Sequence, residues 1–282
     1  MNYRLSPTFN LAVFFSLGWS VLLTGAPPEV PRDLLADDHV REEFGVNQFT
    51  TPSIEKIFED LAALGDLSFG KVRRPIPEHP GRQRALVALN LGMLIADGFL
   101  AVQCEKTNDL EAIGRAFFSH AKLLGVGERM NRHTKSLLDY SVAEKWDLLK
   151  AELVATQADV EAEMVSIRDG DIAHLLSLGG WLRALQIATA ATEKDFSPEK
   201  AARITRRDLA DYYLAQLATL EEDLLSEEVK KHLTRELERI RASFDPPDGV
   251  VDSALIARIG QQVGALLEKI VPSQEKKKEA KP

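Results

Sequence analysis

The chain contains a single cysteine, Cys104, among 282 residues. One cysteine excludes an intramolecular disulfide and a cysteine-ligated zinc site. The protein therefore has to be held together by a packed core, and a chain of this length can bury one without covalent or metal crosslinks. Cys104 ends a very apolar segment, where free cysteine is usually buried. A disulfide between Cys104 and a second chain remains an alternative.

An excess of basic residues is also missing. The formal net charge is −8, with 43 Asp and Glu against 35 Lys and Arg, and the acidic residues are spread along the chain. Nucleic-acid binding requires a basic face that displaces counterions from the phosphates. The composition therefore argues against nucleic acid as a partner.

Aromatic residues make up only 7% of the chain, and runs of β-branched residues are scarce. Ala, Leu, Glu and Lys, which are good helix formers, are abundant. No segment alternates apolar and polar residues over the length of a strand, whereas helical patterns recur between short loops. The sequence predicts an all-α fold with no sheet: an antiparallel helical bundle or a short irregular helical array of about eight to nine helices.

Residues 1–26 are interpreted as a signal peptide or an N-terminal anchor. Arg4 precedes an uncharged run, residues 5–28, whose densest apolar part, Leu11 to Leu23, has the length of a signal-peptide core. Small residues that suit cleavage follow at positions 24–26. The segment indicates an exported protein, periplasmic or extracellular, and a buried N-terminal helix is the remaining alternative. If the segment stays in place, residues 5–28 form a membrane tether.

Three further regions follow the N-terminal segment. Residues 27–50 are rich in Pro, Asp and Glu, which indicates a linker with room for one short helix. Residues 51–271 carry helix after helix and form the predicted all-helical domain. Residues 272–282 are highly charged and are predicted to be a disordered tail.

Several helix starts are marked by side chains that cap the first turn. Asp169, Ser197 and Ser226 each precede a helical pattern. Capping boxes, in which Glu follows the capping residue by three positions, are predicted at Asn108–Glu111 and at Ser141–Glu144. The second box opens a long predicted helix over residues 142–167.

The segment from Ala85 to Val102 is apolar except for Asn90 and Asp97. It spans about 27 Å as a helix, which is long enough for a membrane. However, a charge at mid-depth is costly there, and amphipathic helices surround the segment in sequence. We therefore predict that it is the central helix of the fold. A strip of small residues, four apart, lets another helix approach closely: Ala88, Gly92 and Ala96.

Asn90 and Asp97 lie two helical turns apart and share a face. A buried carboxylate needs a partner, so Asp97 either pairs with an arginine of a neighbouring helix or belongs to a polar site in the bundle interior. His120 and His174 each fall on an apolar stripe, where a hydrogen-bonded core histidine competes with a ligand role. Asp171 precedes His174 by one turn, the spacing that di-iron bundles use.

No second Asp/Glu-x-x-His pair accompanies Asp171 and His174, so no metal site and no cofactor are predicted. Gly-rich phosphate loops, nucleophile elbows, zinc-protease motifs and haem-attachment motifs are also missing from the sequence, and no catalytic residue is predicted. The candidate ligand-binding residues are Asn90, Asp97, His120, Asp171, His174 and Trp181.

The leading functional interpretation is an exported, non-enzymatic helical binding, scaffold or envelope-associated protein. Its predicted partner is another protein or a second copy of the chain. The alternative is a helical-bundle enzyme, or a carrier of a small ligand or metal, with a polar interior site. The two interpretations differ in whether the candidate side chains converge on one cavity.

We expect the mature chain to begin close to Pro27, because cleavage after the small residues at positions 24–26 removes the apolar segment. Intact mass spectrometry of the protein purified from its own cell measures this. A soluble cytoplasmic species that retains Met1 would contradict export.

Overall fold

The computed structural model describes residues 37–77, 80–126, 131–247 and 249–270. Within these ranges every regular element is a helix, α2 to α14, and there is no strand. The all-α prediction is confirmed, with slightly more helices than the eight to nine expected. The predicted signal segment, residues 1–26, and the predicted tail, residues 272–282, lie outside the described residues.

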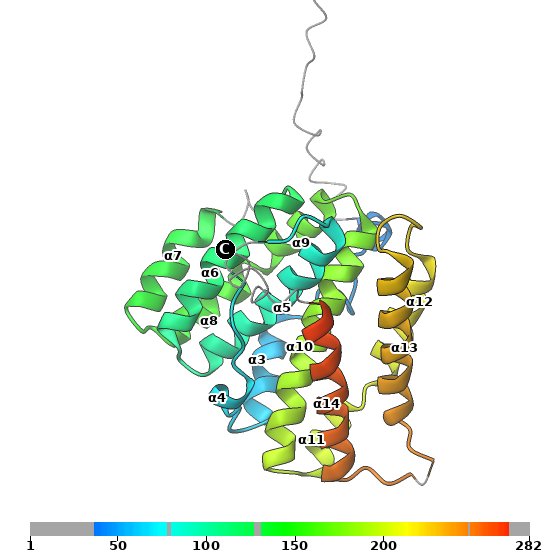
Figure 1. The fold of residues 1–282 in the computed structure, drawn as a ribbon. Helices are drawn as coiled ribbons and strands as arrows, with labels where there is room; N and C mark the ends of the chain where they lie inside the picture. The colour runs from blue at the N-terminus through cyan, green and yellow to red at the C-terminus, as the bar shows by residue number, and fades with distance from the viewer. Residues whose placement is uncertain (1–36, 78–79, 127–130, 248, 271–282) are drawn as a thin grey trace, which may run out of the picture.

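Two long helices form the centre of the fold, α5 (Arg84–Gln103) and α10 (Gly170–Lys194). Figure 1 shows them in the middle of the molecule, with other helices on both sides. α6 (Thr107–Leu124) packs on α5, and α14 (Ser253–Ile270) packs on α10. Most of the core therefore forms around the α5–α10 pair.

The backbones of α5 and α10 touch where they cross. A Cβ atom added to Gly92 would lie 1.8 Å from the carbonyl oxygen of Leu176, and one added to Gly179 would lie 2.0 Å from the carbonyl oxygen of Leu89. No side chain fits between backbones at this separation, so each crossing position requires glycine. The prediction that small residues on α5 allow close helix approach is confirmed.

α5 is buried on nearly all sides. By length and composition it could cross a membrane, but 78% of its most apolar window is buried inside the fold. Its amphipathic neighbours supply the cover: α14, for example, buries Ile256, Ile259 and Val263 at helical spacing. The predicted role of this segment as the central helix is confirmed.

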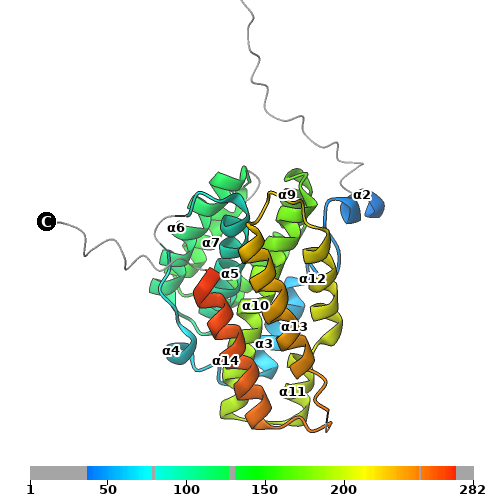
Figure 2. The ribbon, with the colours of Figure 1, turned by 45° about the vertical axis from the view of Figure 1, so that its right-hand side comes forward.

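The other helices form two groups beside the central pair (Figures 1 and 2). α12 and α13 pack together, and α13 also packs on α14; on the other side α7 and α8 form a pair, and α8 contacts α3 and α5. Their bounds are α2 (Asp38–Glu43), α3 (Ile54–Ala63), α4 (Phe69–Val72), α7 (Asn131–Val142), α8 (Trp146–Ala155), α9 (Gln157–Ser166), α11 (Pro198–Ile204), α12 (Arg207–Thr219) and α13 (Glu227–Ser243).

Three of the predicted caps are present. Asp169 accepts a hydrogen bond from the backbone N–H of Ile172 at 3.1 Å, and Ser197 and Ser226 cap α11 and α13 in the same way. The capping box at Asn108–Glu111 is wrong, because α6 already begins at Thr107 without a side-chain cap.

The prediction of one long helix over residues 142–167, opened by Ser141, is also wrong. Ser141 lies inside α7, and Glu144 adopts a left-handed conformation with φ of 55°, which ends that helix. The rest of the segment is divided into α8 and α9 at Thr156. The Thr156 hydroxyl donates to the carbonyl of Leu153 at 2.7 Å, and such local bonds compete with the helix pattern.

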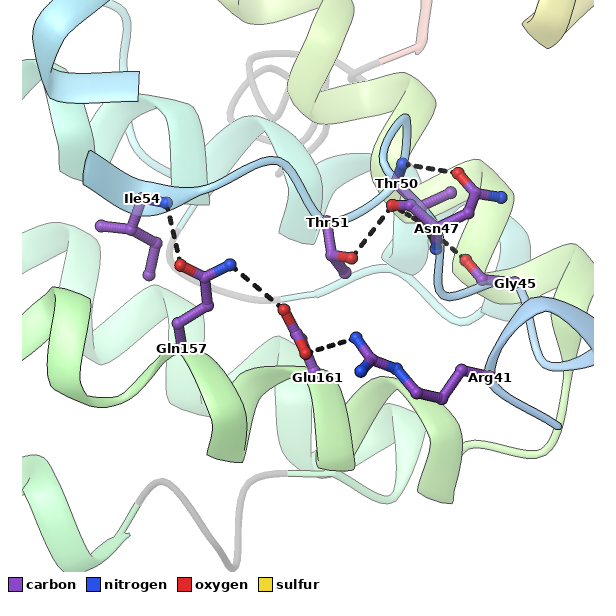
Figure 3. Close-up of polar contacts among 8 residues, drawn as sticks. All are labelled: Arg41, Gly45, Asn47, Thr50, Thr51, Ile54, Gln157 and Glu161. Atoms are coloured by element: carbon purple, nitrogen blue, oxygen red, sulfur yellow. Dashed lines mark hydrogen bonds and ion pairs between the residues drawn. The ribbon is translucent and has the colours of Figure 1, made fainter. Parts of the chain in front are cut away.

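The described part of the expected linker, residues 37–50, lies against the helical body. Figure 3 shows that Arg41 pairs with Glu161 of α9, and that Gln157 accepts from the backbone N–H of Ile54 at 3.2 Å. Between these contacts the chain makes a tight turn, in which the Thr50 hydroxyl donates to the carbonyl of Gly45 at 2.6 Å. α2 and the turn are thus fixed to α9.

Gly45 is required at this turn for two reasons. Its φ is +78°, a conformation that favours glycine, and a Cβ atom there would lie 3.1 Å from the Cβ of Ala173. The turn therefore packs tightly on the first part of α10.

We predict that Gly92→Ala lowers the free energy of unfolding by about 3 kcal/mol or more, because the added methyl group collides with the α10 backbone. Urea denaturation measures the loss. Gly114→Ala in α6 is the matched control, since a Cβ atom there meets nothing within 4 Å; alanine should be neutral or stabilising by about 0.5–1 kcal/mol. Equal effects of the two substitutions would contradict the close crossing.

Candidate functional site

Asp97 is the centre of a buried ion pair. It is 4% exposed, and its Oδ1 accepts a hydrogen bond from Nε of Arg183 in α10 at 2.7 Å. Its Oδ2 accepts from Nε of Arg74, also at 2.7 Å, from the connection between α4 and α5. The expectation that Asp97 pairs with an arginine of a neighbouring helix is confirmed.

Arg183 is 1% exposed, and its two terminal nitrogens each donate a hydrogen bond as well. One guanidinium nitrogen donates to the side-chain oxygen of Gln186 and the other to the backbone carbonyl of Val72. Burial lowers the pKa of Arg183 and the charge of Asp97 opposes that shift; arginine nevertheless stays charged in proteins. Both oxygens of Asp97 accept charged donors, so the carboxylate is engaged in joining α5, α10 and the chain after α4.

The cluster of Asp97, Arg74 and Arg183 contains two positive charges and one negative charge. Arg74 and Arg183 share a single carboxylate, and Nη2 of Arg74 is buried without a hydrogen-bond partner. The positive charge also affects His120 of α6. Burial is the main cause that lowers the pKa of His120, and the charge of Arg74 lowers that pKa further. His120 is therefore a neutral imidazole at physiological pH.

His120 and Asn90 each bond to their own helix. Nδ1 of His120 lies 2.7 Å from the carbonyl oxygen of Ala116, so Nδ1 carries the hydrogen. Nδ2 of Asn90 donates to the carbonyl of Leu86 at 2.9 Å, while its Oδ1 is buried without a partner. Both side chains are thus turned back along the preceding turn.

His174 and Asp171 lie at the start of α10. Burial lowers the pKa of His174, an effect that the charge of Asp171 opposes, and Nδ1 of His174 has no hydrogen-bond partner. Asp171 instead accepts from the backbone N–H of Glu221 at 3.0 Å, which fixes the chain between α12 and α13. The His174 ring packs edge-on against Tyr212, with 5.8 Å between ring centroids.

Trp181 belongs to the packing of α10 on α12. Its ring stacks on Tyr213 at 5.2 Å. The Tyr213 hydroxyl is 2.5 Å from that of Ser177, and both are 3.3 Å from the carbonyl oxygen of Phe49. Burial raises the pKa of Tyr213, which keeps the phenol neutral. These contacts join the turn before α3 to α10 and α12.

In the part of the chain that the structure describes, no hydrogen bond or ion pair joins two of the six candidate residues to each other. Along α10, His174 and Arg183 are nine residues apart, or about 13.5 Å along the helix axis. Among the described residues no three His, Cys, Asp or Glu side chains are grouped to hold a metal ion. Two open surface hollows, one bordered by Cys104 and Lys106 and the other by Asp60 and Arg203, include none of the six candidates.

Three residues that sequence reasoning did not select form buried or partly buried ion pairs: Arg183, Arg74 and His133. Arg183 could have been found, because it lies on the buried stripe of α10 four residues after Gly179 and four before Ile187. Arg74 gives no such signal, since it lies in an irregular connection. His133 gives no such signal either, because the two carboxylates beside its ring, Glu152 and Asp159, belong to other helices.

No protein-family model matches the chain, and neither a curated protein sequence nor a solved structure is significantly similar to it.

We predict that Asp97→Ala costs about 3–5 kcal/mol of folding stability, because it leaves two arginines in the interior without a counter-charge. The urea midpoint measures the loss. Asp208→Ala, which removes an exposed ion pair with Arg206, is the control and should cost no more than about 1 kcal/mol. An unchanged midpoint for Asp97→Ala would mean that the ion pair does not stabilise the central helices.

Proposed function

We propose that the protein is an exported, non-enzymatic helical scaffold that works through protein contacts, and that its main binding surface is the outer side of the α7–α8 hairpin, occupied by a second copy of the chain. The polar interior gives less support to an enzyme or a ligand carrier, because Asp97 is fully engaged by arginines and neither of the two surface hollows is lined by a candidate residue. Export is proposed from residues 1–26.

The observation that carries this proposal is the distribution of exposed apolar side chains. Among the described residues, Leu138, Val142 and Leu148 are 53%, 69% and 47% exposed. With the exposed Ala151 and Val154 they form what we call the outer hairpin face. The neighbouring α6 adds exposed Phe118 and Leu123. Exposed apolar side chains that gather on one part of a surface are typical of binding sites.

Helical spacing places the exposed apolar residues of each helix on one face of that helix. Leu138 and Val142 are four apart on α7, and Leu148 and Ala151 are three apart on α8, so each pair lies on one helix face. The opposite side of the hairpin packs on α3 and α5 through Leu149 and its partly buried neighbours. Both sides of the hairpin therefore carry apolar residues. Among the described residues, other helices cover only one of these sides.

The charge of the hairpin favours a second copy as the occupant. The chain as a whole has a net charge of −8, yet residues 131–156 contain equal numbers of basic and acidic side chains. The basic residues are Arg132, Lys135, Lys145 and Lys150, and the acidic residues are Asp139, Glu144, Asp147 and Glu152. Two acidic molecules repel least where each is locally neutral.

The order of the charges also suits a two-fold contact. Lys135 and Asp139 flank Leu138 on α7, and Lys145 precedes Asp147 at the start of α8. In a two-fold dimer the same patch meets itself, so a patch with both signs of charge can be its own complement. A strongly basic or acidic partner gains no such match.

We predict that the full mature chain dimerises in a concentration-dependent way and that Val142→Glu weakens the dimer at least about tenfold, because the two-fold axis brings the new charge in twice. Sedimentation equilibrium measures the dissociation constant. Ala254→Glu, at an exposed position of α14, adds the same charge elsewhere and should leave the dimer unchanged. A monomer at every concentration, or a dimer that Val142→Glu does not affect, would contradict the proposal.

A further inference from the structure

His133 joins α7 and α8, the two helices of the hairpin, to α9. The residue lies in α7, its Nδ1 is 3.0 Å from Oε1 of Glu152 in α8, and its Nε2 is 2.8 Å from Oδ2 of Asp159 in α9. All three side chains are partly buried. The start of α7 is thereby attached both to its hairpin partner and to the helix that follows.

Both contacts are hydrogen bonds only when the ring is charged. A carboxylate is an acceptor, and a neutral imidazole has one N–H donor and one bare nitrogen. After loss of a proton, one of the two carboxylates would face the lone pair of a ring nitrogen at hydrogen-bond distance. The geometry therefore selects the imidazolium.

α7 depends on this attachment more than the other long helices do. It packs mainly on α8 and only slightly on α6, and it has no extensive contact with α5 or α10. His133 lies five residues before Leu138, at the end of α7 away from the turn to α8. The two bonds of His133 therefore fix the end of α7 that the hairpin turn does not hold.

We propose that His133, Glu152 and Asp159 form a pH-sensitive clamp that holds α7 in register with α8 and so regulates the outer hairpin face. This inference rests on the proposed function, since it assigns regulation to the same surface. With the clamp closed, Leu138 and Val142 of α7 stay aligned with Leu148 of α8. With the clamp open, the free end of α7 separates from α8 and α9 and the face loses its shape.

The direction of the pH effect follows from the charges around the ring. Hydrogen bonds with Asp159 and Glu152 raise the pKa of His133 above its usual 6.5, and partial burial opposes them. On α7 itself Lys135 is exposed to solvent. A raised pKa means that the stabilisation is fully present below the ordinary pKa and is lost as pH rises through the folded-state pKa. The clamp is thus weakened as pH rises and His133 loses its proton.

The clamp can be tested in a Val142→Glu background, at a concentration where sedimentation shows a monomer. NMR follows the titration of the His133 ring, and hydrogen exchange, corrected for its intrinsic pH dependence, follows the backbone amides of α7 from about pH 6 to about pH 9. We expect the protection of α7 to fall as the ring loses its proton, while the protection of α14 stays constant. Constant protection of α7 across this range would overturn the clamp.

Three variants separate the clamp from general effects on stability. His133→Gln should lower the protection of α7 at about pH 6 and remove the pH dependence of that protection. Glu152→Gln should reduce the protection at about pH 6 and also the size of its pH dependence. His39→Gln in α2, which removes an exposed histidine, should behave like the parent protein. A pH dependence that survives in His133→Gln would assign the effect to another group and contradict the proposal.

The regulatory step is tested on the wild-type dimer. Each unit by which the pKa is raised allows up to about a tenfold change in the clamp equilibrium, so the dissociation constant should increase several-fold between about pH 6 and about pH 9, and His133→Gln should abolish this difference. A dimer of equal strength at both pH values overturns the regulation and leaves the proposed function intact. Absence of a dimer at every pH contradicts the proposed function and removes the regulatory role with it.

Discussion

The close crossing of α5 and α10 is the constraint on which the rest of the fold depends. Gly92 and Gly179 let the two backbones touch, and next to this contact Asp97 of α5 pairs with Arg183 of α10. A buried charge without its partner is strongly destabilising, so the ion pair allows few alternative registers of the two helices. α6, α8, α12 and α14 then pack on a fixed pair, and each covers part of its apolar surface.

The same crossing engages the polar groups of the interior in structural contacts. Asp97 has both oxygens in bonds with arginine, and Arg183 has its donors in bonds with three different groups. Bonds of this kind fix the orientation of the carboxylate and of Arg183, which suits a structural joint better than general acid–base work. Exposed large apolar side chains lie instead at the periphery, where the α7–α8 hairpin leaves Leu138, Val142 and Leu148 in solvent.

Predictions from local patterns succeeded where one residue decides the outcome within a few positions. Asp169, Ser197 and Ser226 cap their helices as expected, because a capping side chain needs only the next turn of backbone. The capping boxes predicted at Asn108 and Ser141 are not present, although in each case a Glu follows the expected capping residue by three positions. At these positions the preceding residues continue into helix, and tertiary packing outweighs a bond that stabilises by only about 1 kcal/mol.

The sequence by itself determined the helical class, the central position of the Asn90 and Asp97 segment, the small-residue crossing, and the need of Asp97 for a cationic partner. These follow from periodicity, size and desolvation, which are properties of single segments. Only the tertiary structure decided that the partners of Asp97 are Arg183 and Arg74, and that His133 lies between Glu152 and Asp159. Such contacts join residues far apart in the chain, and their geometry depends on how every intervening helix packs.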